Sequence, residues 1–372
     1  MKRKKTQAQF NIASGSHPGM TGKQNEDRFR VTSFFAGPDR NPCLFAVLCD
    51  GIGGHHAGEI AAEMGVSIIT ERVTSADPDQ PLTVLTDALS AASSAIHQAS
   101  QTSQGRSGMG TTCACAWVIG DRLYTTNLGD SRIYLLRGNH ILQLTTDHTW
   151  VQEAIDAGVI TEDGKEHHPN AHIIRRFLGS QKPADPDFRL WFFEGEKDED
   201  ALKNQGMRLI PGDILLLCSD GITDLIADEE IQNVIQSTPL SKAPDKLIQL
   251  ANSRGGHDNA TLILLERPLE KNRKLKSLIK KRWLATCLSI LILIAALLTA
   301  VILSISWFRG DSQNKPTPSP TMTQTLPPQT DQSPVEITDT SIPTTTNPQQ
   351  LPSELPTAQF TITPWPTHTS FP

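Results

Sequence analysis

The sequence predicts an α+β fold in which antiparallel β-sheets carry helices on their outer faces. Strand-like segments follow one another across short turns, "GDR" at residues 120–122 and "RGN" at residues 137–139, as they do in β-hairpins. Helical patterns come in consecutive pairs, which argues against a doubly wound parallel sheet. An apolar content of 38% gives the 372 residues enough material for a sizeable core.

The predicted elements can be given in chain order. Strands are short apolar or alternating runs bounded by turn residues, and helices show an apolar period near 3.6. The predicted strands are residues 44–49, 113–119, 123–127, 133–137, 188–193, 214–218 and 261–266. The predicted helices are residues 58–72, 81–101, 150–157, 228–236 and 244–253.

These elements all fall within residues 9–267, which we expect to form one domain. Residues 1–8 are basic and are expected to be flexible. No apolar stretch follows them, so we expect no secretory signal.

The segment at residues 284–306 contains 23 residues without a charge. As a helix with a rise of about 1.5 Å per residue it would reach ~34 Å, enough to cross a hydrocarbon core of ~30 Å. Trp283 and Trp307 bracket it in the manner of interface aromatics. A buried core helix is the other interpretation, and it is disfavoured because nothing downstream could bury this segment. We therefore expect one transmembrane helix.

Charges beside this segment predict its orientation. Seven Lys and Arg residues lie at residues 271–282, within a basic juxtamembrane segment at 268–283, against Arg309 and Lys315 beyond the span. The positive-inside rule then predicts a single-pass protein of the cell membrane, with its domain in the cytoplasm and residues 307–372 outside. That tail carries 13 of the 25 prolines and 15 threonines, a composition typical of disorder.

Charge and cysteine usage exclude some functions. A net charge of -6 argues against nucleic acid as a partner. The cysteines lie in apolar runs, which is typical of buried thiols in a reducing compartment. Cys113 and Cys115 are not expected to bind metal, because no second Cys/His pair has matching spacing.

Acidic residues stand where predicted strands meet loops. Asp50 and Asp220 each end an apolar strand and precede a glycine, Asp130 lies between two hairpin strands, and Asp258 precedes a strand. Each of them alone would be an ordinary turn residue. Strands of an antiparallel sheet that end and begin at one edge would bring these carboxylates together, and their mutual repulsion would raise their pKa values. A hard divalent cation, Mg²⁺ or Mn²⁺, would remove that cost. The pair Glu26-Asp27 is a further candidate.

Six motifs in order extend this hypothesis: "NEDRF", "CDGIGGHHAGE", "GMGTT", "NLGDSRIYLLR", "LIPGDILLLCSDGITDLI" and "GGHDNATLILL". Over residues 9–267 the chain resembles the metal-dependent serine/threonine protein phosphatases of the type 2C (PPM) family, and most of all their bacterial branch. The resemblance implies a two-sheet antiparallel β-sandwich flanked by helix pairs (αββα), with two Mn²⁺ or Mg²⁺ ions at one edge and a third weaker site. The resemblance further implies a role for each candidate residue. Asp50 would bridge both metals, the Gly51 carbonyl would bind one of them, and Asp220 and Asp258 would hold the first metal. Glu26 and Asp27 would serve the second metal directly or through water, and Asp130 would belong to the third site.

The activity implied by this resemblance is hydrolysis of phosphoserine and phosphothreonine in proteins by a metal-activated water, without a covalent enzyme intermediate. The partners would then be phosphorylated proteins, and a Ser/Thr protein kinase at the same membrane would be the natural counterpart. Ser219 and Cys218 are accordingly expected only to pack at the end of a strand. The alternative is a catalytically weak phosphatase-fold module that binds phosphoproteins or senses a signal.

Departures from the family pattern concern substrate binding. Relatives usually carry an arginine five residues before Asp27, where this chain has Gly22, and an acidic residue where His17 stands. Lys23 could supply a point charge to the substrate phosphate but no bidentate fork. If Lys23 does not bind the substrate phosphate, the metals, Arg28 or Arg176 would hold it.

The general acid stays open between a histidine of the pair His55-His56 and a metal-bound water. The motif "EHHPNAH", with His167, His168 and His172, is not expected to bind zinc, because Pro169 breaks the helical spacing of its histidines. It falls where the family has a mobile flap over the substrate.

Overall fold

The computed structural model describes residues 10–53, 57–102, 106–161, 164, 168–193, 195–269 and 289–305. The chain divides into two units, residues 1–282 and 283–372. All strands and helices labelled below belong to the first unit.

Two five-stranded sheets, all of whose paired strands are antiparallel, form the centre of this unit. One has the order β1 (Asn11–His17), β12 (Ala260–Glu266), β11 (Ile214–Cys218), β8 (Arg132–Arg137) and β9 (His140–Gln143). The other has the order β10 (Met207–Arg208), β7 (Arg122–Leu128), β6 (Cys113–Ile119), β3 (Asn41–Cys49) and β2 (Arg28–Ala36). A small third sheet pairs β4 (Gly51–Ile52) with β5 (Gly110–Thr111). The predicted antiparallel sheets and both predicted hairpins, β6–β7 and β8–β9, are confirmed.

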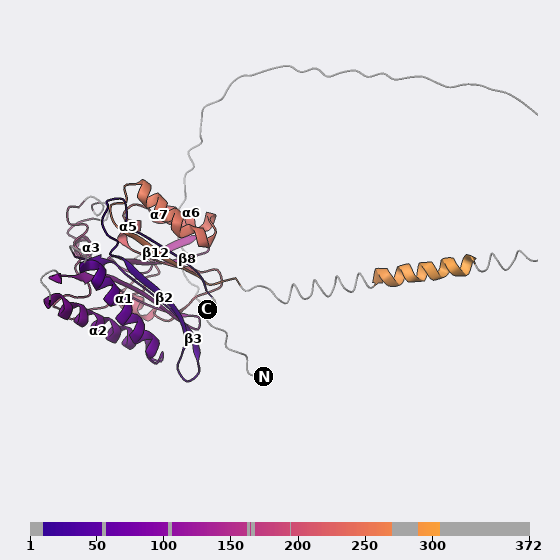
Figure 1. Ribbon diagram of the computed structural model, residues 1–372, viewed down its shortest axis with the longest axis horizontal. Coiled ribbons are helices and arrows are strands. Elements are labelled where there is room, and N and C mark those ends of the chain that lie inside the picture. The colour runs from indigo at the N-terminus through magenta and orange to yellow at the C-terminus, as the bar shows by residue number, and fades with distance from the viewer. Residues whose placement is uncertain are drawn as a thin grey trace, which may run out of the picture. The chain divides into compact units, whose positions relative to one another are not determined.

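Helices cover both outer faces of the sandwich (Figure 1). The pair α1 (Ala57–Ser75) and α2 (Pro81–Gln101) packs on the sheet of β3 and β6, and the pair α6 (Asp228–Ser237) and α7 (Ala243–Ser253) packs on the sheet of β11 and β12. Shorter helices are α3 (Trp150–Asp156), α4 (Asp198–Lys203), α5 (Asp220–Thr223) and the 3₁₀ turn Leu240–Lys242.

Strand β3 shows why its sequence reads as a continuous apolar run. Successive side chains of a strand point to opposite faces. Phe45 and Val47 pack into the layer below α1 and α2, whereas Leu44 and Leu48 pack between the two sheets. Both faces of β3 are therefore buried, and neither admits a polar residue.

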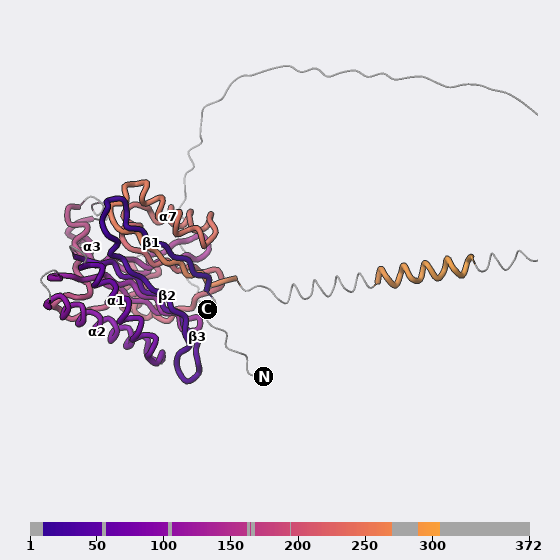
Figure 2. Tube along the Cα trace, in the orientation of Figure 1, coloured from indigo at the N-terminus to yellow at the C-terminus, as the bar shows by residue number. Residues whose placement is uncertain are grey.

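The first two strands go to different sheets. Figure 2 shows β1 running beside α7 and β2 beside α1. Because β1 pairs with β12 and β2 with β3, the connection that carries Glu26 and Asp27 crosses from one sheet to the other at the edge where the predicted acidic residues lie.

The predicted strand at residues 188–193 is wrong. Within this stretch Leu190 is buried, but Phe193 is 58% exposed, and the only pairing nearby is an isolated bridge between Asp187 and Asn127. Its backbone partners are not strands: Leu190 N donates to Ala201 O in α4, and Trp191 N donates to Leu144 O just after β9. Strands β1, β2, β9 and β10 and helices α4 and α5 were not predicted, because they are half-exposed or too short to show a period.

The predicted transmembrane helix is not supported by the structure. Residues 289–305 are helical, but no helix among the described residues is long and apolar enough to cross a membrane. The two ends of the predicted span, the basic start, most of the juxtamembrane segment and the Pro/Thr-rich tail lie outside the described residues.

Candidate active site

Strand pairing brings the predicted carboxylates to one edge of the sandwich. Arg28, the first residue of β2, pairs with Cys49, the last residue of β3, so Asp27 and Asp50 lie next to each other. In the other sheet Cys218 pairs with both Leu262 and Arg132. The residues just beyond these positions, Asp220, Asp258 and Asp130, are therefore neighbours as well.

The pKa of Asp50 is affected by the charges of four other carboxylates of this cluster. Burial raises its pKa well above the ordinary value, and the charges of Asp27, Asp220, Asp130 and Asp258 raise it further, in that order of influence. The cluster thus joins residues from both sheets around Asp50.

The surrounding carboxyl groups have raised pKa values for the same reasons. Burial raises the pKa of Asp27 to about 7, against hydrogen bonds that lower it, and Asp258 adds to the rise. Burial and the charge of Asp147 raise the pKa of Asp130 to about 7. Burial, and then the charges of Asp130, Asp224 and Asp258, raise the pKa of Asp220 well above its usual range.

Three carboxylate oxygens of the cluster have no hydrogen-bond partner although they are buried: Oδ1 of Asp27, Oδ1 of Asp130 and Oδ1 of Asp220. Buried polar atoms in native proteins almost always have partners, so each unpartnered oxygen needs an explanation. A hard divalent cation supplies one, because it binds carboxylate oxygens and offsets their charges. The residues present therefore fit a centre for Mg²⁺ or Mn²⁺.

Glycines bring α1 close to the cluster. A Cβ added at Gly51 would lie 2.4 Å from the carbonyl carbon of Gly58, so the backbones leave no room for a side chain. A Cβ added at Gly58 would lie 2.8 Å from Oε2 of Glu26 and equally close to the carbonyl group of Gly51. The predicted ligands Gly51 and Glu26 thus meet at the start of α1.

Polar residues outside the predicted set of ligands hold the carboxylates in place. Ser219 Oγ donates to Asp27 Oδ2 at 2.9 Å and accepts from Thr261 N at 3.0 Å. The expectation that Ser219 only packs is therefore wrong. The sequence signal for this role was the position of Ser219 directly before Asp220 in the motif "LIPGDILLLCSDGITDLI".

Two other supporting residues act on the backbone. Thr112 Oγ1 accepts from Asp50 N at 2.9 Å, and Asn259 Oδ1 accepts from Glu26 N at 2.7 Å. Thr112 lies inside the motif "GMGTT" and Asn259 inside "GGHDNATLILL". The motifs therefore pointed to these two residues, although neither is a residue type expected to bind the cations.

The predicted phosphate-binding residue, Lys23, is exposed and lies next to Gly22, which has φ +74°. Arg28 is engaged with Glu59 and Glu63. His17 Nδ1 accepts from Gly19 N at 3.1 Å, which gives this histidine a local structural role. His55 and His56, the candidate general acids, lie outside the described residues.

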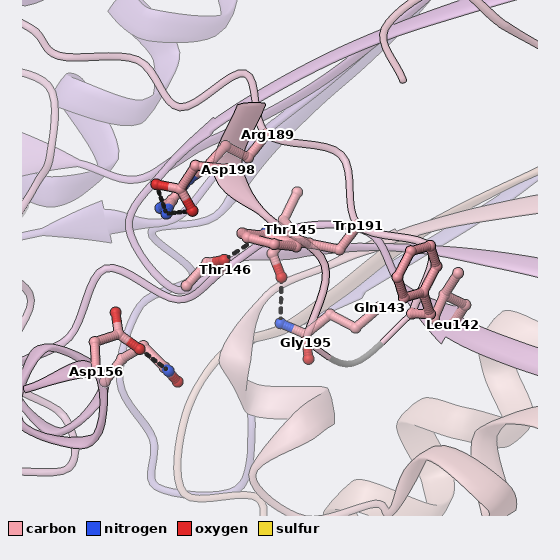
Figure 3. Close-up of a pocket in the computed structure, with 11 residues that line it drawn as sticks. Leu142, Gln143, Thr145, Thr146, Asp156, Arg189, Trp191, Gly195 and Asp198 are labelled. Carbon is pink, nitrogen blue, oxygen red and sulfur yellow. Dashed lines mark hydrogen bonds and ion pairs between the residues drawn. The ribbon is translucent and has the colours of Figure 1, made fainter. Parts of the chain in front are cut away.

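A cavity of about 490 Å³ lies elsewhere in the first unit and is lined by Leu142, Gln143, Asp156, Arg189, Trp191 and neighbours (Figure 3). Figure 3 shows Arg189 paired with Asp198, and Arg189 also lies over the Trp191 ring at 5.4 Å. None of the clustered carboxylates lines it.

Comparisons with known proteins agree with this geometry. The family model described as "Protein phosphatase 2C" matches residues 21–154. The "Serine/threonine phosphatase stp" of Listeria welshimeri is 32% identical over 256 residues, which cover 68% of this chain and 93% of that protein. The structure of the S. agalactiae serine/threonine phosphatase is similar with a TM-score of 0.60 and 29% identity, covering 69% of this chain and 99% of that one.

One similar structure bears on the cation. The catalytic domain of the serine threonine protein phosphatase PstP, solved in complex with 2 manganese ions, has a TM-score of 0.56 and 30% identity, with coverage of 69% of this chain and 97% of that domain.

Proposed function

This chain belongs to the protein phosphatase 2C family, and on that premise we propose that its first unit hydrolyses phosphoserine and phosphothreonine in proteins with Mn²⁺ or Mg²⁺. The observation that carries the proposal is the set of buried, unpartnered carboxylate oxygens on Asp27, Asp130 and Asp220, whose charges raise the pKa of Asp50. Such a cluster is costly without cations and is suited to hold them.

The roles of the ligands follow the site prediction. Asp50 would contribute to holding two cations, and the Gly51 carbonyl would contribute to one of them. Asp220 and Asp258 would complete the site of the first cation, and Glu26 and Asp27 that of the second. Asp130 would belong to a third site. When bound, the cations supply a water of lowered pKa and positive charge for the phosphoryl oxygens.

The chain's own residues prepare the site for this chemistry. The clustered carboxyl groups give up their protons when cations bind, Ser219 keeps Asp27 oriented, and Thr112 fixes the backbone of Asp50. Neither neighbouring nucleophile is available for covalent catalysis, since Ser219 Oγ is engaged on both sides and burial raises the pKa of the Cys218 thiol well above its ordinary value. Water is then the attacking group.

The direct test is turnover of a phosphothreonine peptide by the full chain with Mn²⁺ and then with excess chelator. We expect turnover that the chelator abolishes and added Mn²⁺ restores. Turnover that persists in chelator would refute the metal-dependent mechanism.

The alternative function, a catalytically weak binding or sensing module, is favoured by one observation. Gly22 stands where relatives carry an arginine, and a conformation with φ +74° does not suit an arginine. Binding of a phosphopeptide without measurable turnover in Mn²⁺ would favour this alternative.

We also propose a membrane location, supported by the uncharged residues 284–306 and by the seven Lys and Arg residues at 271–282. The first unit would lie in the cytoplasm, the tail outside, and a Ser/Thr kinase at the same membrane would supply the phosphoproteins.

A further inference from the structure

His148 lies between the loop that carries Asp130 and a second buried aspartate. It follows β9 in the chain and is 4% exposed. His148 N donates to Gly129 O at 2.9 Å, and Gly129 N donates to His148 Nδ1 at 3.1 Å. This one residue therefore provides a partner for both backbone polar groups of Gly129, directly before Asp130.

Hydroxyl groups hold the same loop from its other side. Ser131 Oγ and Thr112 Oγ1 share a hydrogen bond of 2.8 Å, and Thr112 Oγ1 also accepts from Asp50 N. A Cβ added at Gly129 would lie 2.6 Å from Cγ2 of Thr112, so the loop packs directly on this threonine. The loop at residues 129–131 is thus linked to His148 and, through Thr112, to the backbone of Asp50.

The hydrogen bond from Gly129 determines the tautomer of His148. An N–H group can donate only to a ring nitrogen that carries no hydrogen, so Nδ1 is the acceptor and the ring hydrogen is on Nε2. Nε2 lies 3.3 Å from Oδ2 of Asp187, a residue only 7% exposed. The ring therefore donates to a carboxylate on one side and accepts from the loop of Asp130 on the other.

Asp187 is itself held firmly. Its Oδ1 accepts from Arg189 N at 2.8 Å, its Oδ2 accepts from Arg189 Nε at 3.0 Å, and its backbone exchanges two hydrogen bonds with Asn127 of β7. Burial raises the pKa of Asp187, but the hydrogen bonds from His148 and Arg189 outweigh it and lower the pKa below its ordinary value. Asp187 is therefore a fixed carboxylate acceptor for the ring of His148.

We propose that His148 is a positioning residue of the candidate active site. Asp187 keeps its ring in the form with hydrogen on Nε2, and the free Nδ1 then holds the loop of Asp130 in place. The inference rests on the proposed function and adds to it a determinant of ligand geometry outside the set of ligands. If His148 only stabilised the fold, the activity of its variants would follow their stability.

The variants separate the two ring nitrogens. His148→Asn keeps an acceptor near the position of Nδ1 and loses the donor to Asp187. His148→Gln keeps a donor near the position of Nε2 and loses the acceptor for Gly129 N. His140→Asn, at the exposed start of β9, is the matched control.

Asp187→Asn changes the tautomer without changing the histidine. Its amide oxygen would stay with the backbone N–H of Arg189, so its NH₂ group would face Nε2 of His148. That group donates, so it favours a ring with its hydrogen on Nδ1. Such a ring cannot accept from Gly129 N.

All measurements use the full chain. Ring ¹⁵N shifts of histidine-labelled, metal-free protein report the tautomer, and urea unfolding in chelator reports stability. The electron paramagnetic resonance signal of free Mn²⁺ gives the Mn²⁺ affinity. Steady-state kinetics on a phosphothreonine peptide at saturating Mn²⁺ give kcat and KM.

We expect wild-type His148 to carry its hydrogen on Nε2 and Asp187→Asn to move it to Nδ1. His148→Gln and Asp187→Asn should lower kcat and weaken Mn²⁺ binding by roughly tenfold each, as the loss of an outer partner of a metal site does. His148→Asn should lose clearly less activity than His148→Gln at a similar loss of stability, and KM should change little. His140→Asn should match the wild type.

Equal kcat for His148→Asn and His148→Gln, or a wild-type ring with hydrogen on Nδ1, would overturn the inference. If a His148 variant does not fold, Asp187→Asn carries the comparison, and wild-type kcat in that variant would overturn it as well. A wild-type chain that binds Mn²⁺ without turnover would refute the proposed function alone, and the order of the Mn²⁺ affinities would then decide the inference. A wild-type chain that binds no Mn²⁺ would refute both.

Discussion

Ser219 Oγ donates a 2.9 Å hydrogen bond to Asp27 Oδ2, joining the end of β11 to the connection that precedes β2 in the other sheet. The same oxygen accepts a hydrogen bond from Thr261 N. One hydroxyl therefore orients a candidate metal ligand and also provides the partner of a buried backbone N–H group in β12.

Ser219→Ala should therefore weaken both fold and site. It leaves the buried Thr261 N and Asp27 Oδ2 without their partner, which costs about 1–3 kcal/mol of unfolding free energy. Urea unfolding in chelator measures the stability, and kcat at saturating Mn²⁺ measures the site. Ser253→Ala, whose exposed hydroxyl donates to Leu250 O of its own helix, is the control and should change neither.

Asp220→Asn and Asp258→Asn should each abolish turnover of a phosphothreonine peptide while the fold persists. Carboxylates that repel one another do not stabilise the apo fold, and Asp220→Asn should raise the Tm in chelator because burial penalises its charge. Asp245→Asn, on the exposed face of α7, should keep full activity. Full activity of either cluster variant would exclude that residue as a ligand.

The stability of the metal-free protein should fall as pH rises from about 5 to about 8. The pKa of Asp27 and of Asp130 rises from 3.8 to about 7 on folding, so the folded state binds more protons than the unfolded state across this window. Asp187 acts in the opposite direction only at lower pH, because its pKa is lowered in spite of its burial by hydrogen bonds from His148 and Arg189.

Thermal unfolding in chelator at pH 5 and pH 8 measures this dependence, and Asp27→Asn should flatten it. Added Mn²⁺ displaces those protons and should raise the Tm more at pH 8 than at pH 5.5. A metal-free Tm that increases between pH 5 and pH 8 would contradict the buried-carboxylate account.

Lys23→Ala should lower kcat/KM for both a phosphopeptide and a small aryl phosphate, by roughly tenfold for the loss of a charge-assisted contact. The reason is that both substrates share the phosphoryl group. Equal kinetics for the variant and the wild type would show that Lys23 does not touch the phosphate, which the cations or Arg176 would then hold.

Gly22→Arg should not simply restore the arginine of relatives. No atom lies within 4 Å of the position of its Cβ, but φ +74° is unfavourable for arginine by about 1 kcal/mol or more. We expect a lower Tm, with any gain in kcat/KM reduced by that strain. Gly120→Arg, at a similarly open position with φ +68°, is the control for the backbone cost alone.

The topology proposal predicts that protease added to intact cells trims the tail and leaves the first unit whole. The physical reason is that seven positive charges at residues 271–282 resist transfer across the membrane. Immunoblots against the two ends of the chain measure the outcome. Cleavage within the first unit while the tail is protected would reverse the orientation.

Local sequence patterns were sufficient to predict many of the strands and helices. Strands β3, β6 and β11 are buried on both faces and show clear apolar runs, and α2 shows a clear helical period over its length. The period of α1 is weak, because this long helix carries apolar and small residues around most of its circumference. The stretch at residues 188–193 is also rich in apolar residues, but its backbone donates to α4 and to the residue after β9 instead of to a strand. Apolar content alone does not tell these cases apart.

The sequence by itself determined the candidate ligands: its motifs place Asp27, Asp50, Asp130, Asp220 and Asp258 at or near the ends of predicted elements, where ligands can converge. Only the tertiary structure decided which oxygens lack partners, that Ser219 holds Asp27, that Gly22 has a positive φ, and that His148 lies between Gly129 and Asp187. The physical reason is range. Strand and helix patterns follow from residues a few positions apart, whereas a ligand site is made where elements separated by tens or hundreds of residues meet, and that meeting depends on the packing of both sheets at once.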